Sequence, residues 1–394
     1  MFSRYTLGAA ALVLTGFLVA VIPAQAQKTK DEVHPTELEK GRWKTSDGIP
    51  DGYRRIWKGR YELQTNCDDE LSKQTMTHLN SMAKVFKTML RPRKTLKNRM
   101  VVKLFRTRKH FMDYGAPAGA AAYFSPSIGE MVGYDTGVAG GKVRSQATSG
   151  GKNTFEEWRQ RNSMDVLGVM CHEGWHQYFH YNCGSKVHFP AWCDEGIAEY
   201  FYSAYVDPKN KKKFIVGSPN DIRLATIQRA LLGDAITPLE MFVQYEQRRY
   251  YANSSLHYAQ GALFVHFLME HPKYKKKKYV PRFVSVFLDQ HSIKKTIPQV
   301  FGKKPKWDRM TKDYKDWTLA IPRVVDPISP MAELTKQFNV EAKKRFDALE
   351  PAVRKALQAC LDKRAQTPWQ AQAKAKAKAK AKAKAKAEEP ASAN

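Results

Sequence analysis

Two pairs of residues with the same four-residue spacing constrain the fold of this chain more than any other feature. Residues 171–200 read CHEGWHQYFHYNCGSKVHFPAWCDEGIAEY, with His172 and His176 as one pair and Glu195 and Glu199 as the other. Residues four apart lie on one face of an α-helix, one turn apart. The pattern therefore predicts one helix presenting two imidazoles and a second presenting two carboxylates. That second stretch is so apolar that carboxylates without partners would be costly there.

These four residues and Glu173 have the chemistry of a catalytic zinc site. Two imidazole nitrogens and one carboxylate oxygen, with a fourth position open, make such a site, and His-Glu-x-x-His on a helix is one sequence form of it. Glu173 is rotated by about 100° from His172, which suits holding a water beside the ion. We therefore expect one Zn²⁺ per chain, bound by His172, His176 and Glu195. Glu199 would accept the outer N–H of a ligand histidine and so set its tautomer.

The arrangement resembles the gluzincins, zinc peptidases whose third ligand is a glutamate on a second helix. HEGWH, then eighteen residues, then EG has a spacing similar to that of the aminopeptidase N family. AWCDEGIAEYF is similar to that family's W-x-N-E-G-x-A stretch, with Asp194 where asparagine is usual. Residues 258–268, YAQGALFVHFL, resemble the segment that carries the family's transition-state tyrosine. Residues 61–320 as a whole look more like the small bacterial peptidase MA-like gluzincins, which pair a short αβ half with a helical half.

The resemblance implies a reaction and a role for each residue. Glu173 would take a proton from the attacking water and pass it to the leaving amine, while Tyr258 would donate a hydrogen bond to the developing oxyanion. His257 is the alternative acid, because some gluzincins use histidine there, and we expect His266 to be a core residue. The aminopeptidases hold the free amine of their substrate with a Gly-x-Met-Glu-Asn loop. This chain has SIGEMVGYD instead, which favours an endopeptidase acting on a peptide or protein substrate.

The N-terminus predicts export. Arg4 precedes an apolar run and the small-x-small sequence Ala24-Gln25-Ala26, which are the features of a secretory signal peptide. We therefore expect a protein that is secreted, or held in the periplasm or cell envelope, with no stable membrane span after cleavage. The expected divisions are a signal peptide at 1–26, a linker at 27–55, a zincin-like catalytic domain at 56–325, a C-terminal helical segment at 326–365 and a disordered Lys-Ala tail at 366–394.

The order of elements predicts an α+β fold of the zincin-like type. We expect a small mixed sheet with helices in the N-terminal half, then the zinc-ligand helices and a mainly helical C-terminal half. Strands are expected at residues 60–65, 100–105 and 130–135, the last being an edge at which an extended peptide could pair. Helices are expected over the two histidines to about residue 183, from Pro190 to about residue 206, and from about residue 255 to 270.

Charge leaves a second functional class open. The formal net charge is +28, and residues 373–387 alternate alanine with seven lysines. Such a tail would attract an anionic surface polymer or nucleic acid, although a solubilising surface explains the charge equally well. The alternative function is therefore a non-catalytic cell-surface or anionic-polymer-binding protein, built on a gluzincin scaffold with a polybasic tail.

The cysteines add one structural expectation. There are five, an odd number that leaves at least one thiol unpaired within the chain. Cys183 and Cys193 flank the loop between the two motifs, which makes them the best candidates for a disulfide in an exported protein. Cys171 precedes His172 on the helix and is expected to be a buried free thiol.

Overall fold

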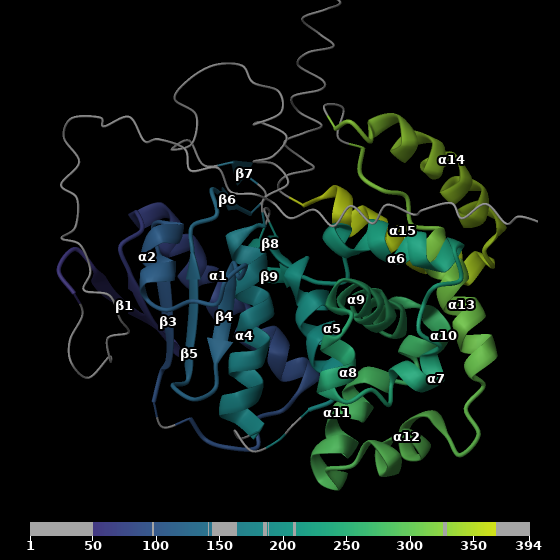
Figure 1. Cartoon of the computed structure of the whole chain (residues 1–394), viewed down its shortest axis with the longest axis horizontal. Helices are drawn as coiled ribbons and strands as arrows, with labels where there is room; N and C mark the ends of the chain where they lie inside the picture. The colour runs from purple at the N-terminus through teal and green to yellow at the C-terminus, as the bar shows by residue number, and fades with distance from the viewer. Residues whose placement is uncertain are drawn as a thin grey trace, which may run out of the picture. The chain divides into compact units, whose positions relative to one another are not determined.

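The sheet of the computed structural model has five strands in the order β1-β2-β3-β5-β4 (Figure 1). The strands are β1 (Arg54–Lys58), β2 (Tyr61–Thr65), β3 (Met100–Phe105), β5 (Glu130–Tyr134) and β4 (Ala122–Ser125). The three inner strands run parallel, and β1 and β4 pair antiparallel at the two edges. Leu63, Val102 and Met131 are fully buried on the inner strands. The predicted combination of a small mixed sheet with helices is therefore confirmed.

The structure describes residues 50–96, 98–140, 142–143, 164–183, 187, 189–207, 210–325 and 329–367, all within the unit Glu37–Asn394. The predicted signal peptide, the predicted linker up to residue 49 and the Lys-Ala tail beyond residue 367 lie outside this part of the chain. The sheet begins at Arg54, two residues before the predicted start of the catalytic domain. Among the described residues, none of the helices has the length and apolar character needed to cross a bilayer.

The edge of the sheet differs from the prediction. Residues 130–135 were expected to form an edge, but β5 lies between β3 and β4, so this prediction is wrong. The edge strand is β4, which lies in a Gly- and Ala-rich segment between the strands predicted at 100–105 and 130–135. A tight turn explains the difference: Gly129 N–H donates to Ser125 O at 2.8 Å, and Gly129 has a positive φ of 70°, which glycine adopts readily. The chain therefore folds back at once and places β4 outside β5.

The first long helix, α1 (Asp69–Met89), packs between the sheet and the rest of the molecule. Its first turn is capped by the Asp68 side chain, which accepts a hydrogen bond from Leu71 N at 2.9 Å. Apolar side chains at helical spacing, including Leu79 and Phe86, are fully buried. The remaining small elements of this half are α2 (Arg108–Asp113), β6 (Val138–Ala139) and β7 (Lys142–Val143).

Two helices carry the motif residues and pack against each other. They are α4 (Val166–Cys183) and α5 (Ala191–Tyr202). Gln177 fixes α4 to the sheet, because its Nε2 donates to Val101 O at 2.7 Å. α4 ends where predicted and α5 begins directly after Pro190, but α5 stops four residues before the predicted residue 206. The chain there turns into a hairpin of β8 (Tyr205–Asp207) and β9 (Asn210–Ile215), whose strand pairing replaces a further helical turn.

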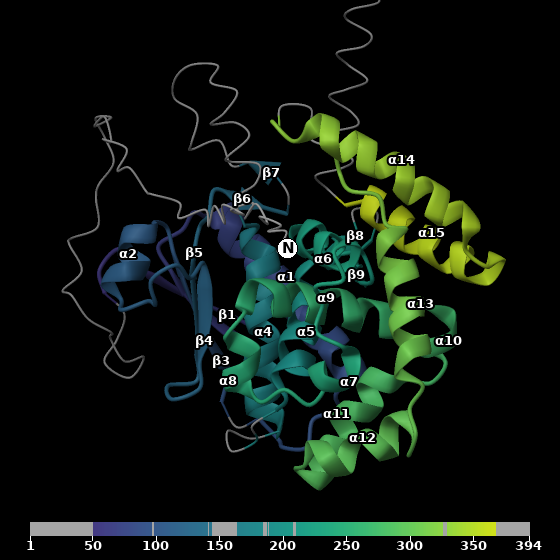
Figure 2. The same cartoon turned by 45° about the vertical axis from the view of Figure 1, so that its right-hand side comes forward.

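Helices make up the C-terminal half (Figure 1, green to yellow). They are α6 (Asp221–Leu232), α7 (Leu239–Phe242), α8 (Gln247–Tyr251), α9 (Ser254–Glu270), α10 (Pro272–Lys275), α11 (Tyr279–Gln290), α12 (Ile293–Phe301), α13 (Trp307–Leu319), α14 (Ala332–Ala348) and α15 (Pro351–Ala365). The predicted helix ending near residue 270 is confirmed as α9, which lies among α5, α6 and α13. In Figures 1 and 2, α14 and α15 lie together on the side away from the sheet.

Glycines allow α5 and α9 to cross closely. A Cβ atom built on Gly196 would lie 2.8 Å from the carbonyl oxygen of Gly261 and 2.6 Å from a methyl group of Val265. Contacts this short do not occur in real structures, so neither backbone could keep its place if Gly196 carried a side chain. Since Gly196 follows Glu195 and Gly261 lies one turn after Tyr258, this crossing sets the distance between those two functional candidates.

The cysteines correct the predicted disulfide. All five are free thiols, so the expected Cys183–Cys193 bridge is absent. Cys193 belongs to α5 and is fully buried in the hydrophobic core, whereas Cys183 lies half-buried at the end of α4. Spacing along the chain does not fix the direction of side chains that leave two different helices, and disulfide geometry depends on that direction. Cys171 is a buried free thiol, as predicted, and lies 2.7 Å from His78 Nε2.

Candidate metal centre

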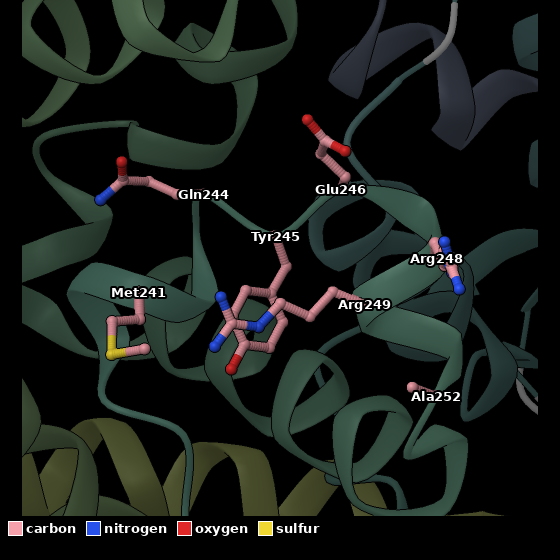
Figure 3. Close-up of a pocket in the computed structure, with 7 residues that line it drawn as sticks. All are labelled: Met241, Gln244, Tyr245, Glu246, Arg248, Arg249 and Ala252. Atoms are coloured by element: carbon pink, nitrogen blue, oxygen red, sulfur yellow. The ribbon is translucent and has the colours of Figure 1, made fainter.

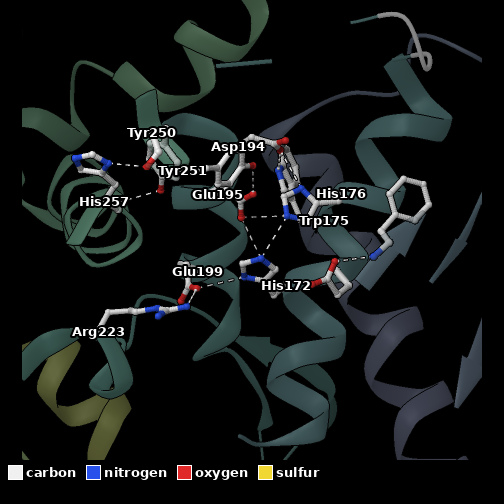
Figure 4. A network of polar contacts seen from close by, with 12 residues as sticks. His172, Trp175, His176, Asp194, Glu195, Glu199, Arg223, Tyr250, Tyr251 and His257 are labelled. Carbon is white, nitrogen blue, oxygen red and sulfur yellow. Dashed lines mark hydrogen bonds and ion pairs between the residues drawn. The ribbon is translucent and has the colours of Figure 1, made fainter. Parts of the chain in front are cut away.

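Three predicted ligands meet between α4 and α5 (Figure 4). The Nε2 atoms of His172 and His176 are 3.3 Å apart. Oε2 of Glu195 lies 3.2 Å from His172 Nε2 and 3.4 Å from His176 Nε2. Two turns of regular helix and one helix crossing thus bring two nitrogens and one oxygen to a common point. Among the described residues, this is the group of histidine, cysteine and acidic side chains able to hold a metal ion.

The separations of these donor atoms fit a small tetrahedral ion. Zinc bonds of about 2.0–2.2 Å in a tetrahedron place neighbouring ligand atoms about 3.3–3.6 Å apart. The three observed separations of 3.2, 3.3 and 3.4 Å fall within or next to that range. In addition, Glu195 Oε2 is buried and receives no hydrogen bond from a described residue. A buried carboxylate oxygen without a donor calls for another positive partner, so the donor set fits a divalent cation.

Charge at the cluster favours a cation as well. Burial alone would lower the pKa of both imidazoles, but the surrounding carboxylates outweigh it. The pKa of His172 is raised by Glu195, Glu173 and Glu199, and that of His176 is raised well above its usual range by Asp194 and Glu195. Burial would raise the pKa of Glu195, yet the two histidines hold it well below its usual range. The centre of this group therefore stabilises positive charge.

Glu199 lies behind His172. Its Oε1 is 3.6 Å from His172 Nδ1, so the carboxylate faces the ring nitrogen that points away from the cluster. Two residues of α6 fix Glu199 in turn: Arg223 Nη2 donates to Oε1 at 2.6 Å, and Asn220 Nδ2 donates to Oε2 at 2.7 Å. Asn220 is also the N-cap of α6. The beginning of α6 therefore positions the carboxylate that faces the outer nitrogen of His172.

Asp194 has the same relation to His176. Its Oδ1 is 3.3 Å from His176 Nδ1 and accepts a hydrogen bond from Trp175 Nε1 at 2.9 Å. The sequence indicated Asp194 only as a replacement for the asparagine of a related motif. Helical spacing gave no signal for this contact, because neighbouring residues on a helix point about 100° apart. Each ligand histidine thus has a carboxylate on its outer nitrogen.

Tyr251 is a site residue that sequence reasoning missed. Its hydroxyl donates to Glu195 Oε1 at 2.7 Å, which leaves Oε2 facing the histidines. Tyr251 is the last residue of α8, outside every motif, and no spacing rule connects it to α5. The contact arises because α8 packs on α5 and α9.

Glu173 faces the edge strand and lies outside the ligand triad. Its Oε2 accepts a hydrogen bond from the backbone N–H of Phe124, in β4, at 2.9 Å. Its side chain is part-exposed, whereas His172 and Glu195 are buried. The carboxylate therefore lies between the histidine pair and the open edge of the sheet.

Tyr258 and His257 have different surroundings, although they are neighbours in α9. The Tyr258 ring stacks on His172, with 6.3 Å between centroids and 15° between planes, and the Arg223 guanidinium lies 5.2 Å over the tyrosine ring. Burial and then Glu195 raise the pKa of Tyr258 far above its usual value, so its hydroxyl stays protonated. His257 points elsewhere: Nδ1 lies 2.6 Å from Tyr250 O and Nε2 lies 3.2 Å from Thr237 Oγ1. The structure brings Tyr258 to the cluster and does not bring His257.

A pocket of about 600 Å³ lies on α7, α8 and the segment between them (Figure 3). Its lining residues are Met241, Gln244, Tyr245, Glu246, Arg248, Arg249 and Ala252. The Arg249 guanidinium lies 4.5 Å over the Tyr245 ring. None of the ligand residues lines this pocket, but α8 contributes both to it and, through Tyr251, to the centre.

Comparison with known proteins found a match to one protein family, whose description gives no function. Residues 166–283 match a family described as a protein of unknown function (DUF1570). This stretch begins with α4 and contains every residue of the centre from His172 to Tyr258. No curated protein matches the chain. The match therefore covers the candidate metal centre and the helices that support it, and it leaves the five-stranded sheet outside.

Proposed function

We propose that this protein is a zinc-dependent endopeptidase of the gluzincin type, with a zincin-like fold, that acts outside the cytoplasm. The observation that carries the proposal is the meeting of three donor atoms, on His172, His176 and Glu195, at separations of 3.2 to 3.4 Å. A carboxylate, a phenol and an open strand edge surround this point. A purely structural zinc site is closed by a fourth protein ligand, whereas three ligands leave a position for water or substrate.

The proposed zinc would be held by the two imidazoles and Glu195. When bound, it would supply Lewis acidity that lowers the pKa of a water and polarises a carbonyl. Asp194 and Glu199 would keep the outer nitrogens of the histidines protonated, so that the inner nitrogens point inward as acceptors. The Tyr251 hydroxyl would keep Glu195 turned so that Oε2 faces the centre.

The remaining residues would carry out the proton transfers. Glu173 would accept a proton from the attacking water and deliver it to the nitrogen of the leaving amine. Tyr258 would donate its hydroxyl hydrogen to the oxygen of the substrate carbonyl as negative charge develops there. The outer edge of β4 would pair with the backbone of an extended peptide and align its carbonyl with these groups. The predicted signal peptide supports a secreted or cell-envelope location.

The test is digestion of a peptide library, read by mass spectrometry, with and without a zinc chelator. Glu173→Gln removes the base and keeps the shape, so it should retain about one zinc and lose nearly all cleavage. His172→Ala should lose the zinc as well. Glu240→Gln, at an exposed position of α7, is the matched control and should cleave like wild type. Chelator-insensitive cleavage, or full zinc content in His172→Ala, would refute the proposal.

A further inference from the structure

A second recess lies where the turn between β1 and β2 meets the loop between α1 and β3. Its volume is about 1070 Å³. It is lined by Gly59, Arg60, Glu62, Pro92, Arg93, Lys94, Thr95, Leu96, Asn98, Arg99 and Val101. We call it the basic groove. It contains none of the residues of the metal centre, and the proposed peptidase reaction makes no use of it.

The groove has an excess of positive charge that the described residues do not neutralise. Its cations are Arg60, Arg93, Lys94 and Arg99, against the single acid Glu62. Glu62 is already engaged: Arg55 Nε lies 2.9 Å from Oε1, Gln64 Nε2 donates to Oε1 at 2.8 Å and Trp57 Nε1 donates to Oε2 at 3.1 Å. Its charge is therefore already paired with that of Arg55.

Among the residues that the structure describes, Arg93 is the one of these four cations with an acidic partner. Its Nη1 lies 2.8 Å from Asp289 Oδ1, and its Nη2 donates to Ser285 O at 3.3 Å. Arg60, Lys94 and Arg99 form no ion pair with any residue that the structure describes. Three like charges around one recess repel each other, and an anion placed between them would remove that repulsion.

Hydrogen bonds hold the walls of the groove in place. Met100 N–H donates to Arg60 O at 2.8 Å, which joins the β1–β2 turn to the start of β3. Arg93 N–H donates to Asn182 O at 3.1 Å, and the Tyr178 hydroxyl donates to Leu90 O at 2.8 Å, so the loop is tied to the end of α4. Cations on a fixed frame lose less conformational freedom when they bind than cations on a mobile segment.

We propose that the basic groove binds a linear polyanion whose repeating units carry phosphate or sulfate groups. The guanidinium groups of Arg60 and Arg99 suit the paired oxygens of such groups. A volume of about 1070 Å³ exceeds what one such group needs and accommodates several repeating units. The lining residues include no aromatic side chain, and grooves for single-stranded nucleic acids stack bases on aromatic rings. The occupant is therefore a chain without bases, such as polyphosphate or a sulfated polysaccharide.

The test compares two full-length variants with the same loss of charge. The groove variant carries Arg60→Gln, Lys94→Gln and Arg99→Gln. The matched control carries Lys303→Gln, Lys304→Gln and Lys306→Gln, three exposed residues between α12 and α13. Both keep the Lys-Ala tail, so any contribution of the tail is the same. Binding of short polyphosphate, of a sulfated hexasaccharide and of oligothymidylate is measured by fluorescence anisotropy over a series of salt concentrations.

The groove variant should bind polyphosphate or the hexasaccharide about 100-fold more weakly, and the slope of log K against log salt should fall by about 3. The control should change by less than about 3-fold. The probe that wild type binds more tightly identifies the source of the anion. Equal losses of affinity in the groove variant and the control would overturn the proposal. It would also be overturned if wild type bound oligothymidylate as tightly as polyphosphate or the hexasaccharide and the groove variant weakened that binding equally. If the triple variant melts early, Lys94→Gln with Arg99→Gln, both at exposed positions, provides the same comparison.

Discussion

The backbone N–H of Phe124 donates to Oε2 of Glu173 at 2.9 Å, so the edge strand of the sheet holds the carboxylate that follows the first histidine of the motif. This N–H points out of the sheet, toward α4, and is not used in pairing with β5. One donor on the strand therefore fixes the direction of the proposed base. The same strand edge is where the substrate backbone is proposed to lie.

Phe124→Pro should lower kcat about 10-fold and leave the zinc content unchanged. Proline removes the N–H but fits an edge position whose N–H faces away from the ladder, so the sheet should persist. Glu173 would then lose its orientation, and a mispositioned general base loses part of its 10²–10⁴-fold contribution. Phe124→Ala keeps the N–H and is the control. If both variants lose the same activity, the aromatic ring matters and the hydrogen bond does not.

Tyr251→Phe should weaken zinc binding by about 10–100-fold, as the loss of a group that orients a metal ligand typically does. The change deletes the hydroxyl that donates to Glu195 Oε1 and keeps the ring. Glu195 could then turn its Oε2 away from the histidines. Competition with a fluorescent zinc chelator measures the change. Zinc affinity equal to that of wild type would show that the helix alone fixes Glu195.

Tyr258→Phe, unlike Tyr251→Phe, should lower turnover and leave zinc binding nearly unchanged. Zinc affinity should stay within about 2-fold, because no donor atom is lost, while kcat falls by about 10²–10³ with the loss of the hydrogen bond to the oxyanion. The phenol has a raised pKa, so it is available as a donor up to strongly alkaline pH. Steady-state kinetics on a peptide from the library digest measures the change. Near-normal turnover would assign the oxyanion to another donor.

Acid should destabilise the fold through His266. Trp317 Nε1 donates to His266 Nδ1 at 3.3 Å, and Nε2 faces Gly217 O at 3.3 Å, so the neutral ring is the one that fits. Burial lowers its pKa from 6.5 to about 4. Below pH 6.5 the unfolded chain therefore takes up a proton that the folded chain does not. The free energy of unfolding should fall by up to about 3 kcal/mol between pH 6.5 and 4.

Denaturant titrations at several pH values check this prediction. His266→Gln should be less stable at neutral pH and should have a flatter dependence on pH. His291→Gln, at an exposed position after α11, should keep the wild-type slope. If the free energy of unfolding of His266→Gln falls with pH as steeply as that of wild type, the acid sensitivity belongs to other groups.

Local patterns were enough to predict the cluster of candidate ligands, whereas the contacts that the sequence did not reveal depend on long-range packing. His172, His176, Glu195 and Glu199 could be placed because helical spacing fixes which residues share a face. The predicted start of α5 at Pro190 was also within a residue, since proline suits the beginning of a helix. The wrong edge strand had a different origin: β4 is only four residues long, reads Ala-Tyr-Phe-Ser and carries no clear alternation, so only its pairing with β5 shows that it forms a strand.

Tyr251 and Phe124 illustrate the same limit within the site. Tyr251 reaches Glu195 only because α8 packs on α5, and Phe124 acts through a backbone N–H that any residue but proline would supply. Neither has a side-chain signature at a fixed spacing from the motif. The disulfide prediction was wrong because ten residues of separation carry no information on the direction of Cys183 and Cys193.

The crossing of α5 and α9 at Gly196 and Gly261 has a consequence for motion. Their backbones are in contact, and a single Cβ would not fit between them, so the two helices can neither slide nor separate locally without losing the contact. Glu195 and Tyr258 therefore keep the same separation for as long as this contact persists. Any widening of the proposed site would therefore involve the opposite wall, where β4 pairs with β5 on one side and is held on the other by the hydrogen bond from Phe124 N–H to Glu173.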